Sequence, residues 1–92
     1  MTLERECRMT VYTGTSEFNL VCQPKQRLGR RVLSVLSGDV PVGAVVRIDC
    51  GESLVFGEVW ACWSNSGVTH AVLELSEVLT GHMEIVSRSG LM

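Results

Sequence analysis

The densest group of side chains that could bind a ligand is a basic segment in the first half of the chain. Arg27, Arg30 and Arg31 lie close together, with Gly29 between them and Lys25 just before them. A guanidinium group offers parallel N–H donors to a phosphate or carboxylate, and a glycine lets the backbone approach a bound group. The segment predicts a site for an anionic ligand or an acidic partner, with Arg27, Gly29, Arg30 and Arg31 as candidate ligand-binding residues. The alternative is a solvated basic loop, balanced by acidic residues elsewhere.

A cysteine and a histidine on two consecutive predicted strands offer a second kind of chemistry. If the hairpin between them centres on Ser66, Cys62 faces His70, and an imidazole beside a thiol can produce a reactive thiolate. The same register places Glu58 opposite Glu74, and like charges directly opposite each other are unfavourable. A packed thiol beside a surface imidazole is the simpler interpretation. We therefore expect no catalytic residue and no enzyme activity.

The other potential metal ligands have no spacing that predicts a metal site. Neither a C-x-x-C pair nor a zinc-like combination of cysteine and histidine occurs, so we expect no metal and no cofactor. The first residues are charged and lack the apolar stretch of a secretory signal, which favours a cytoplasmic protein. In that compartment we expect buried free thiols rather than two disulfides. The four cysteines are Cys7, Cys22, Cys50 and Cys62.

Composition and length indicate one small folded domain, residues 1–92. Eight Lys+Arg stand against ten Asp+Glu, and 46% of the residues are hydrophobic. Such a chain is too apolar for intrinsic disorder, and its acidic balance argues against DNA or RNA as a partner. No apolar run reaches the length of a membrane-spanning helix, so we expect no membrane partner.

Period-two alternation of apolar and polar residues predicts six strands. Pro24 is expected to end the second of them, leaving 23–30 as a polar loop. The tail, about 76–92, is expected to hold a short helix capped by Ser76 or Thr80. Six short strands joined by glycine turns predict an all-β fold, a small antiparallel six-stranded β-barrel, with a sandwich as the alternative. The strands lie at about 8–12, 18–22, 31–36, 44–49, 53–63 and 69–75.

The predicted strand 53–63 is apolar on both faces, whereas the outer face of a barrel strand usually contacts water. Simple alternation sends Trp60 and Trp63 to opposite faces, so that at least one belongs to the core and the other can anchor an interface. Gly57 suggests a bulge or bend. Either the tail or a second copy of the chain covers the outer face, and we expect a homodimer. The candidate interface residues are Phe56, Trp60 and Trp63.

Three segments in the second half of the chain resemble the PilZ domain family. They are V-G-A-V-V-R-I at 42–48, G-E-V-W at 57–60 and A-V-L-E-L at 71–75, and the resemblance covers about residues 20–80. PilZ domains are bacterial six-stranded β-barrels. The resemblance implies binding of cyclic di-GMP, a second messenger, followed by a change in contacts with a partner protein or an attached domain.

The ligand motifs of the PilZ family match this chain incompletely. R-x-x-x-R occurs at Arg27 and Arg31, but only eleven residues separate it from the glycine of V-G-A-V-V-R-I, where the family has three strands. Alignment from the second half instead places Gly29 on the glycine of [D/N]-x-S-x-x-G, with Pro24 at the Asp/Asn position and Gln26 at the Ser position. This departure implies a degenerate or absent nucleotide site.

Two functions therefore remain open. The first is a small regulatory binding module, either a cyclic di-GMP sensor or a ligand-blind adaptor that binds an unknown protein partner. The second is a structural protein–protein interaction module that works through its apolar strand and has no nucleotide ligand.

Overall fold

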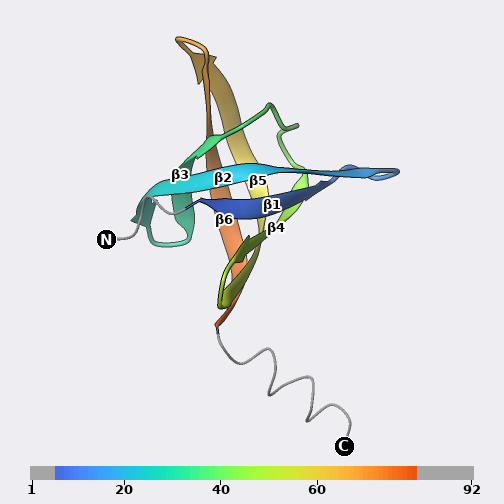
Figure 1. Ribbon diagram of the computed structural model, residues 1–92, viewed down its shortest axis with the longest axis vertical. Helices are drawn as coiled ribbons and strands as arrows, with labels where there is room; N and C mark the ends of the chain where they lie inside the picture. The colour runs from blue at the N-terminus through green and yellow to red at the C-terminus, as the bar shows by residue number, and fades with distance from the viewer. Residues whose placement is uncertain (1–5, 81–92) are drawn as a thin grey trace, which may run out of the picture.

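A computed structural model describes residues 6–80 as a closed antiparallel barrel of six strands (Figure 1). Around the barrel the strands follow the order β1-β2-β3-β6-β5-β4, each hydrogen-bonded to its neighbours. The β5–β6 and β1–β2 hairpins project from the barrel in different directions (Figure 1). The all-β six-stranded barrel predicted from the sequence is thus confirmed. The strands are β1 Cys7–Tyr12, β2 Glu17–Leu28, β3 Arg31–Leu36, β4 Val45–Cys50, β5 Ser53–Asn65 and β6 Val68–Thr80.

Alternate residues of the strands point inward and fill the barrel. This period-two pattern puts one apolar side of each strand into a shared core, which is the main source of the fold's stability. A buried polar side chain in β1, Thr10, is satisfied because its hydroxyl donates a hydrogen bond to Asn19 Oδ1 at 2.8 Å. The largest completely buried apolar side chains are Met9, Val11, Val46, Val59 and Leu73.

Strand β2 continues through Pro24, so the prediction of a polar loop at 23–30 is wrong. Pro24 pairs with Ser34 and Gln26 pairs with Leu33, which leaves one extra residue, Lys25, in a β-bulge. A bulge relaxes the hydrogen-bond ladder locally, and it is one of the places where a strand accepts proline. The chain therefore remains paired with β3 as far as Leu28.

Strand β6 extends to Thr80, which overturns the prediction of a helix capped by Ser76; a helix capped by Thr80 would fall in 81–92, outside the described residues. Phe56 pairs with Glu77 and Gly57 with Leu75, so Ser76 is the extra residue of a bulge. Its hydroxyl donates a hydrogen bond to the carbonyl oxygen of Phe56 at 3.1 Å. The irregularity expected at Gly57 is confirmed. The remainder of the predicted tail helix, 81–92, lies outside the described residues.

Two of the four cysteines form a disulfide, which corrects the expectation that all four are free thiols. Cys7 begins β1 and Cys50 ends β4, and these neighbouring antiparallel strands bring their Cα atoms to 4.7 Å. The sequence separation of 43 residues hides this proximity, which only the closure of the barrel creates. Cys22, which is buried, and Cys62, which is half-buried, remain free thiols.

Candidate functional site

The predicted basic site forms the tight turn between β2 and β3. Leu28 pairs with Arg31, so Gly29 and Arg30 are the two turn residues. Gly29 has a φ of +64°, the conformation required at the first position of a type II′ turn. The Arg27 Nε donates to the carbonyl oxygen of Gly29 at 2.9 Å. The glycine is thus explained by the turn alone, independently of any ligand.

The three arginines of the turn reach three different hollows of the surface. The bulge in β2 shifts the alternation of side chains, so Arg27 pairs with the inward-facing Val32 and lines the open end of the barrel. Arg31 contributes to a hollow on the outer side of β2, β3 and β6, and Arg30 contributes to another beside β5 and β6. The R-x-x-x-R pair, Arg27 and Arg31, therefore lines two different hollows and not one common site.

Glutamate side chains lie near the two outward-facing arginines, Arg30 and Arg31. Glu74 pairs directly with Arg31 across β3 and β6, and it also pairs with Glu58 across β5 and β6. Arg30 lines a hollow of about 280 Å³ together with these two glutamates. Negative charge at short range reduces the positive potential that an anion would meet at Arg30 and Arg31.

Both tryptophans lie on the outer surface of the barrel, which corrects the prediction that one belongs to the core. Val59 pairs with Leu73 and Ala61 with Val72, so Trp60 is the extra residue of a bulge. This bulge shifts the alternation by one residue, and as a result Trp60 and Trp63 share one side of β5. They are 50% and 43% exposed, respectively.

Two ring contacts hold these tryptophans on the surface. The Arg31 guanidinium lies over the Trp60 ring, with its Cζ 4.0 Å from the ring centroid. Trp63 stacks on His70 with ring centroids 5.6 Å apart and an interplanar angle of 15°. A cation above an indole face contributes about 0.5–1 kcal/mol at an exposed site, which helps to fix the side chain of Trp60.

The hypothetical Cys62–His70 pair does not form. Ser66 and Gly67 make a two-residue turn, both with positive φ, so Cys62 pairs with Ala71 and His70 pairs with Trp63. The predicted register was one residue in error at the tip. The bulge at Trp60 compensates for this shift of one residue. Below the bulge the pairing is as predicted, so Glu58 does lie opposite Glu74.

We call the outward surface of β3, β6 and β5 around these rings the aromatic face. Cross-strand pairing places its side chains side by side on three neighbouring strands. Leu33 on β3 pairs with Val72 on β6, next to Trp60 on β5, and Val35 pairs with His70, which pairs with Trp63. Sequence reasoning missed the contributions of β3 and β6, because they become visible only once the order of strands around the barrel is known. The aromatic face consists of Leu33, Val35, Trp60, Trp63, His70 and Val72.

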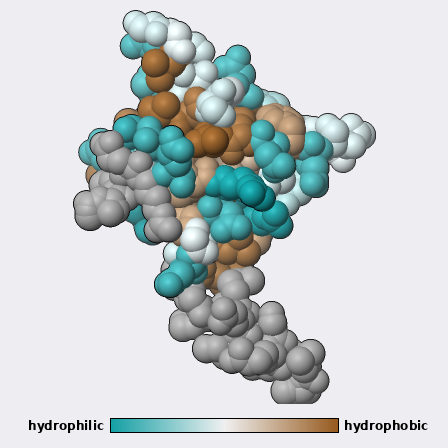
Figure 2. Space-filling model, in the orientation of Figure 1, coloured by the Kyte–Doolittle hydropathy of each residue, from teal (hydrophilic) through white to brown (hydrophobic). Residues whose placement is uncertain are grey.

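Phe56 lies apart from the aromatic face. It pairs with Arg47 on one side and Glu77 on the other, and it is half-buried. Charged neighbours on both sides make it a weaker interface candidate than the two tryptophans. The space-filling view shows apolar side chains on the visible surface between the β5–β6 tip and the body of the barrel, and again near the foot of the molecule (Figure 2).

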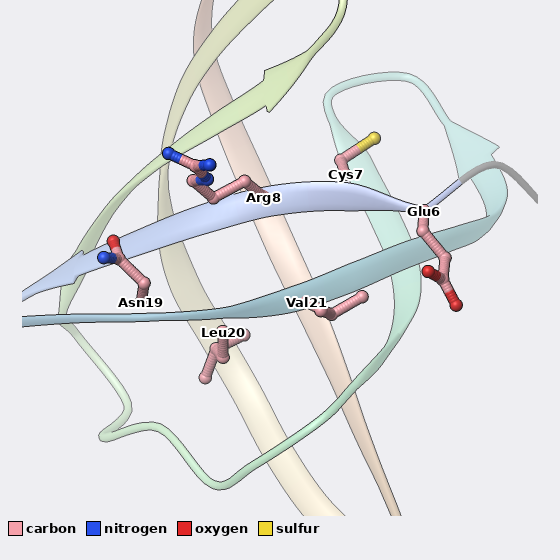
Figure 3. Close-up of a pocket in the computed structure, with 6 residues that line it drawn as sticks. All are labelled: Glu6, Cys7, Arg8, Asn19, Leu20 and Val21. Atoms are coloured by element: carbon pink, nitrogen blue, oxygen red, sulfur yellow. The ribbon is translucent and has the colours of Figure 1, made fainter.

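A further hollow, of about 360 Å³, lies along β1 and β2 (Figure 3). Its carboxylate and guanidinium, from Glu6 and Arg8, point in different directions and do not converge on a common point (Figure 3). Its aliphatic lining comes from Leu20 and Val21. This surface has neither the enclosure nor the convergent polar groups of a ligand site.

Among residues 6–80, no three histidine, cysteine, aspartate or glutamate side chains gather in a way that could hold a metal ion. The same residues include no helix of the length and hydrophobicity needed to cross a bilayer. Comparison of the chain with family models, curated protein sequences and solved structures gives no match. The resemblance to PilZ domains accordingly stays a prediction from the sequence.

Burial should make Cys22 an unreactive thiol and make folding stability depend on pH. Burial raises its pKa from 9.0 to about 11, although the nearby Ser34 hydroxyl lowers it slightly. Between these values the unfolded chain loses this proton while the folded protein retains it, so stability should fall as pH rises from about 9 to 11. Denaturant unfolding across this range should show a steeper loss for the wild type than for Cys22→Ala. If the stabilities of the wild type and Cys22→Ala fall equally between pH 9 and 11, the pKa of Cys22 is not raised in the folded protein.

Proposed function

We propose that this chain is a non-catalytic interaction module that acts through the aromatic face, and that its first partner is a second copy of itself. The observation that carries the proposal is the common orientation of Trp60 and Trp63, whereas Arg27, Arg30 and Arg31 diverge. Tryptophan and arginine are the residues most enriched among those that dominate binding energy at protein interfaces. In terms of the PilZ resemblance, the module is an adaptor that does not bind cyclic di-GMP.

A second copy fits the aromatic face because a twofold interface brings the same surface of each chain together. The edge of the face carries opposite charges side by side, since Arg31 pairs with Glu74. Two copies can therefore approach without the repulsion that a surface of one sign would cause. Strands β3, β6 and β5 are paired with one another beneath the aromatic face, so an association through this face uses side chains and not added sheet hydrogen bonds.

The tryptophans provide a direct measurement of this association. Trp60 and Trp63 are the only tryptophans in the chain, so all tryptophan fluorescence comes from the aromatic face. Sedimentation should give twice the chain mass of 10.1 kDa at high concentration, and the emission should shift to the blue over the same concentration range. Trp60→Ala and Trp63→Ala should each weaken association by about tenfold or more, because anchor residues contribute about 1.4 kcal/mol or more.

Phe18→Ala is the matched control. Phe18 is also an aromatic residue, 38% exposed, but it lies on β2 near the other hairpin tip. Its replacement should leave the association constant unchanged. A wild-type protein that stays at 10.1 kDa at high concentration would contradict the proposal.

Calorimetry with cyclic di-GMP separates this proposal from a nucleotide sensor. We expect no heat of binding at millimolar ligand, because the arginines of the turn do not converge. Saturable heat that is lost in both Arg27→Ala and Arg31→Ala would instead establish the sensor function.

A further inference from the structure

We propose that the open end of the barrel is a binding site for a small amphipathic anion, a molecule with an aliphatic body, one carboxylate and one further hydrogen-bonding oxygen. The site, which we call the mouth pocket, has a volume of about 380 Å³. This lies at the lower end of the range for small-molecule sites. It is separate from the aromatic face, so the proposal does not depend on self-association.

The lining of the mouth pocket favours an aliphatic body. Side chains from β3, β4, β5 and β6 contribute branched aliphatic groups at this end of the barrel, and Pro24 closes the side formed by β2. Transfer of aliphatic groups from water into such a lining is favourable by about 0.8 kcal/mol per CH₂. The aliphatic residues are Val32, Ile48, Val55, Leu75 and Val78.

The hydroxyl group of Ser34 is buried and lacks a hydrogen-bond partner among the described residues. It lines the mouth pocket and is 0% exposed, and no described residue forms a hydrogen bond of normal geometry with its Oγ. The neighbouring Cys22 thiol is only a weak partner. Buried polar atoms are nearly always satisfied by the protein or by a bound molecule, so this hydroxyl needs a partner that the described residues do not supply. An oxygen on a ligand would satisfy the Ser34 hydroxyl.

Arg27 supplies a cation at the rim of the mouth pocket. The bulge at Lys25 directs it to this side of the strand, where it pairs with Val32. In contrast to Arg30, which shares its hollow with Glu58 and Glu74, Arg27 has no carboxylate beside it among the described residues that line the pocket. Its charge is thus available to a carboxylate whose aliphatic body lies deeper in the barrel.

Three probes separate the contributions of these groups: octanol, octanoate and 8-hydroxyoctanoate, titrated into the full chain and followed by calorimetry and by NMR shifts of Ser34, Val55 and Val78. We expect octanoate to bind more tightly than octanol, and 8-hydroxyoctanoate more tightly than octanoate. Arg27→Gln should remove the preference for octanoate over octanol, a loss of about tenfold. Ser34→Ala should remove the advantage of the added hydroxyl and leave octanoate binding unchanged.

Arg30→Gln is the matched control, because it removes the same charge from the same turn at a residue that lines a different hollow. It should leave all three affinities unchanged. Val78→Trp, which fills the pocket from its rim, should abolish binding of all three probes while the barrel's circular dichroism spectrum is kept. Equal weakening by Arg27→Gln and Arg30→Gln, persistent binding in Val78→Trp, or no saturable binding of octanoate would each overturn the proposal.

Discussion

Replacement of Gly57 by alanine should destabilise the barrel by about 3 kcal/mol, at the upper end of what overpacking costs. A Cβ atom at this position would lie 2.5 Å from the carbonyl oxygen of Glu74 and 3.3 Å from the Cα of Leu75. Both obstacles are backbone atoms of β6, which cannot move aside as a flexible side chain can. The two strands would have to separate where the bulge at Ser76 already interrupts their pairing.

The expected sign is opposite to that of an ordinary glycine-to-alanine change. Where the backbone allows it, this change stabilises a protein by about 0.4–1 kcal/mol, because it restricts the unfolded chain. The collision at Gly57 should outweigh that gain and lower Tm by more than about 10 °C in a domain of this size. Thermal unfolding followed by circular dichroism measures the change.

Gly38→Ala is the control for this prediction. The nearest atom to a Cβ there is Leu20 Cδ2 at 3.9 Å, an ordinary van der Waals contact with a side chain, and the φ of Gly38 is not in the left-handed region. Its Tm should change by only a few degrees. If Gly57→Ala melts within a few degrees of Gly38→Ala, the close approach of β5 and β6 is not as described.

The strands could be predicted because each carries its own period-two signal. Strand β3 was predicted with the bounds that the structure has, since Val32, Ser34 and Leu36 alternate with residues that point outward. The bulges could not be predicted in the same way, because an extra residue depends on the partner strand. The positions of Lys25 and Trp60 in bulges are therefore properties of β2–β3 and β5–β6 pairing and not of either strand alone.

Those bulges decide the candidate sites. A shift of one residue moves every following side chain to the other face of its strand. The bulge in β2 separates Arg27 from Arg31, although the sequence suggested that they act together. The bulge in β5 brings together Trp60 and Trp63, although the sequence suggested that they point apart. A correct fold prediction thus accompanied an incorrect prediction of which side chains share a surface.

The disulfide could not be predicted from the sequence because its two cysteines are distant along the chain. Oxidised protein, unfolded in denaturant without reductant, should have two reactive thiols per chain, from Cys22 and Cys62, and reduced protein should have four. A thiol titration that finds four in the protein purified without reductant would contradict the bond between Cys7 and Cys50.

Removal of this disulfide should lower the free energy of unfolding by about 2–4 kcal/mol. The bond joins residues 43 apart, and restriction of a loop of that length in the unfolded chain corresponds to about 4 kcal/mol in the chain-entropy description. The total stability of a small domain is about 5–15 kcal/mol, so this loss is a large fraction of it. Denaturant unfolding of the double variant Cys7→Ala/Cys50→Ala, with and without reductant, measures the effect.

The response to reductant distinguishes the covalent bond from simple packing of the two sulfur atoms. Reductant should lower the stability of the wild type toward that of the double variant and leave the double variant unchanged. Cys62→Ala is the control, because it removes a free thiol and should keep the full sensitivity to reductant. Since Cys7 is buried and Cys50 packs against the core, the double variant also loses apolar contacts. Reduced wild type should therefore be slightly more stable than the double variant. The difference in their free energies of unfolding measures the contribution of the apolar contacts of Cys7 and Cys50, apart from the disulfide bond.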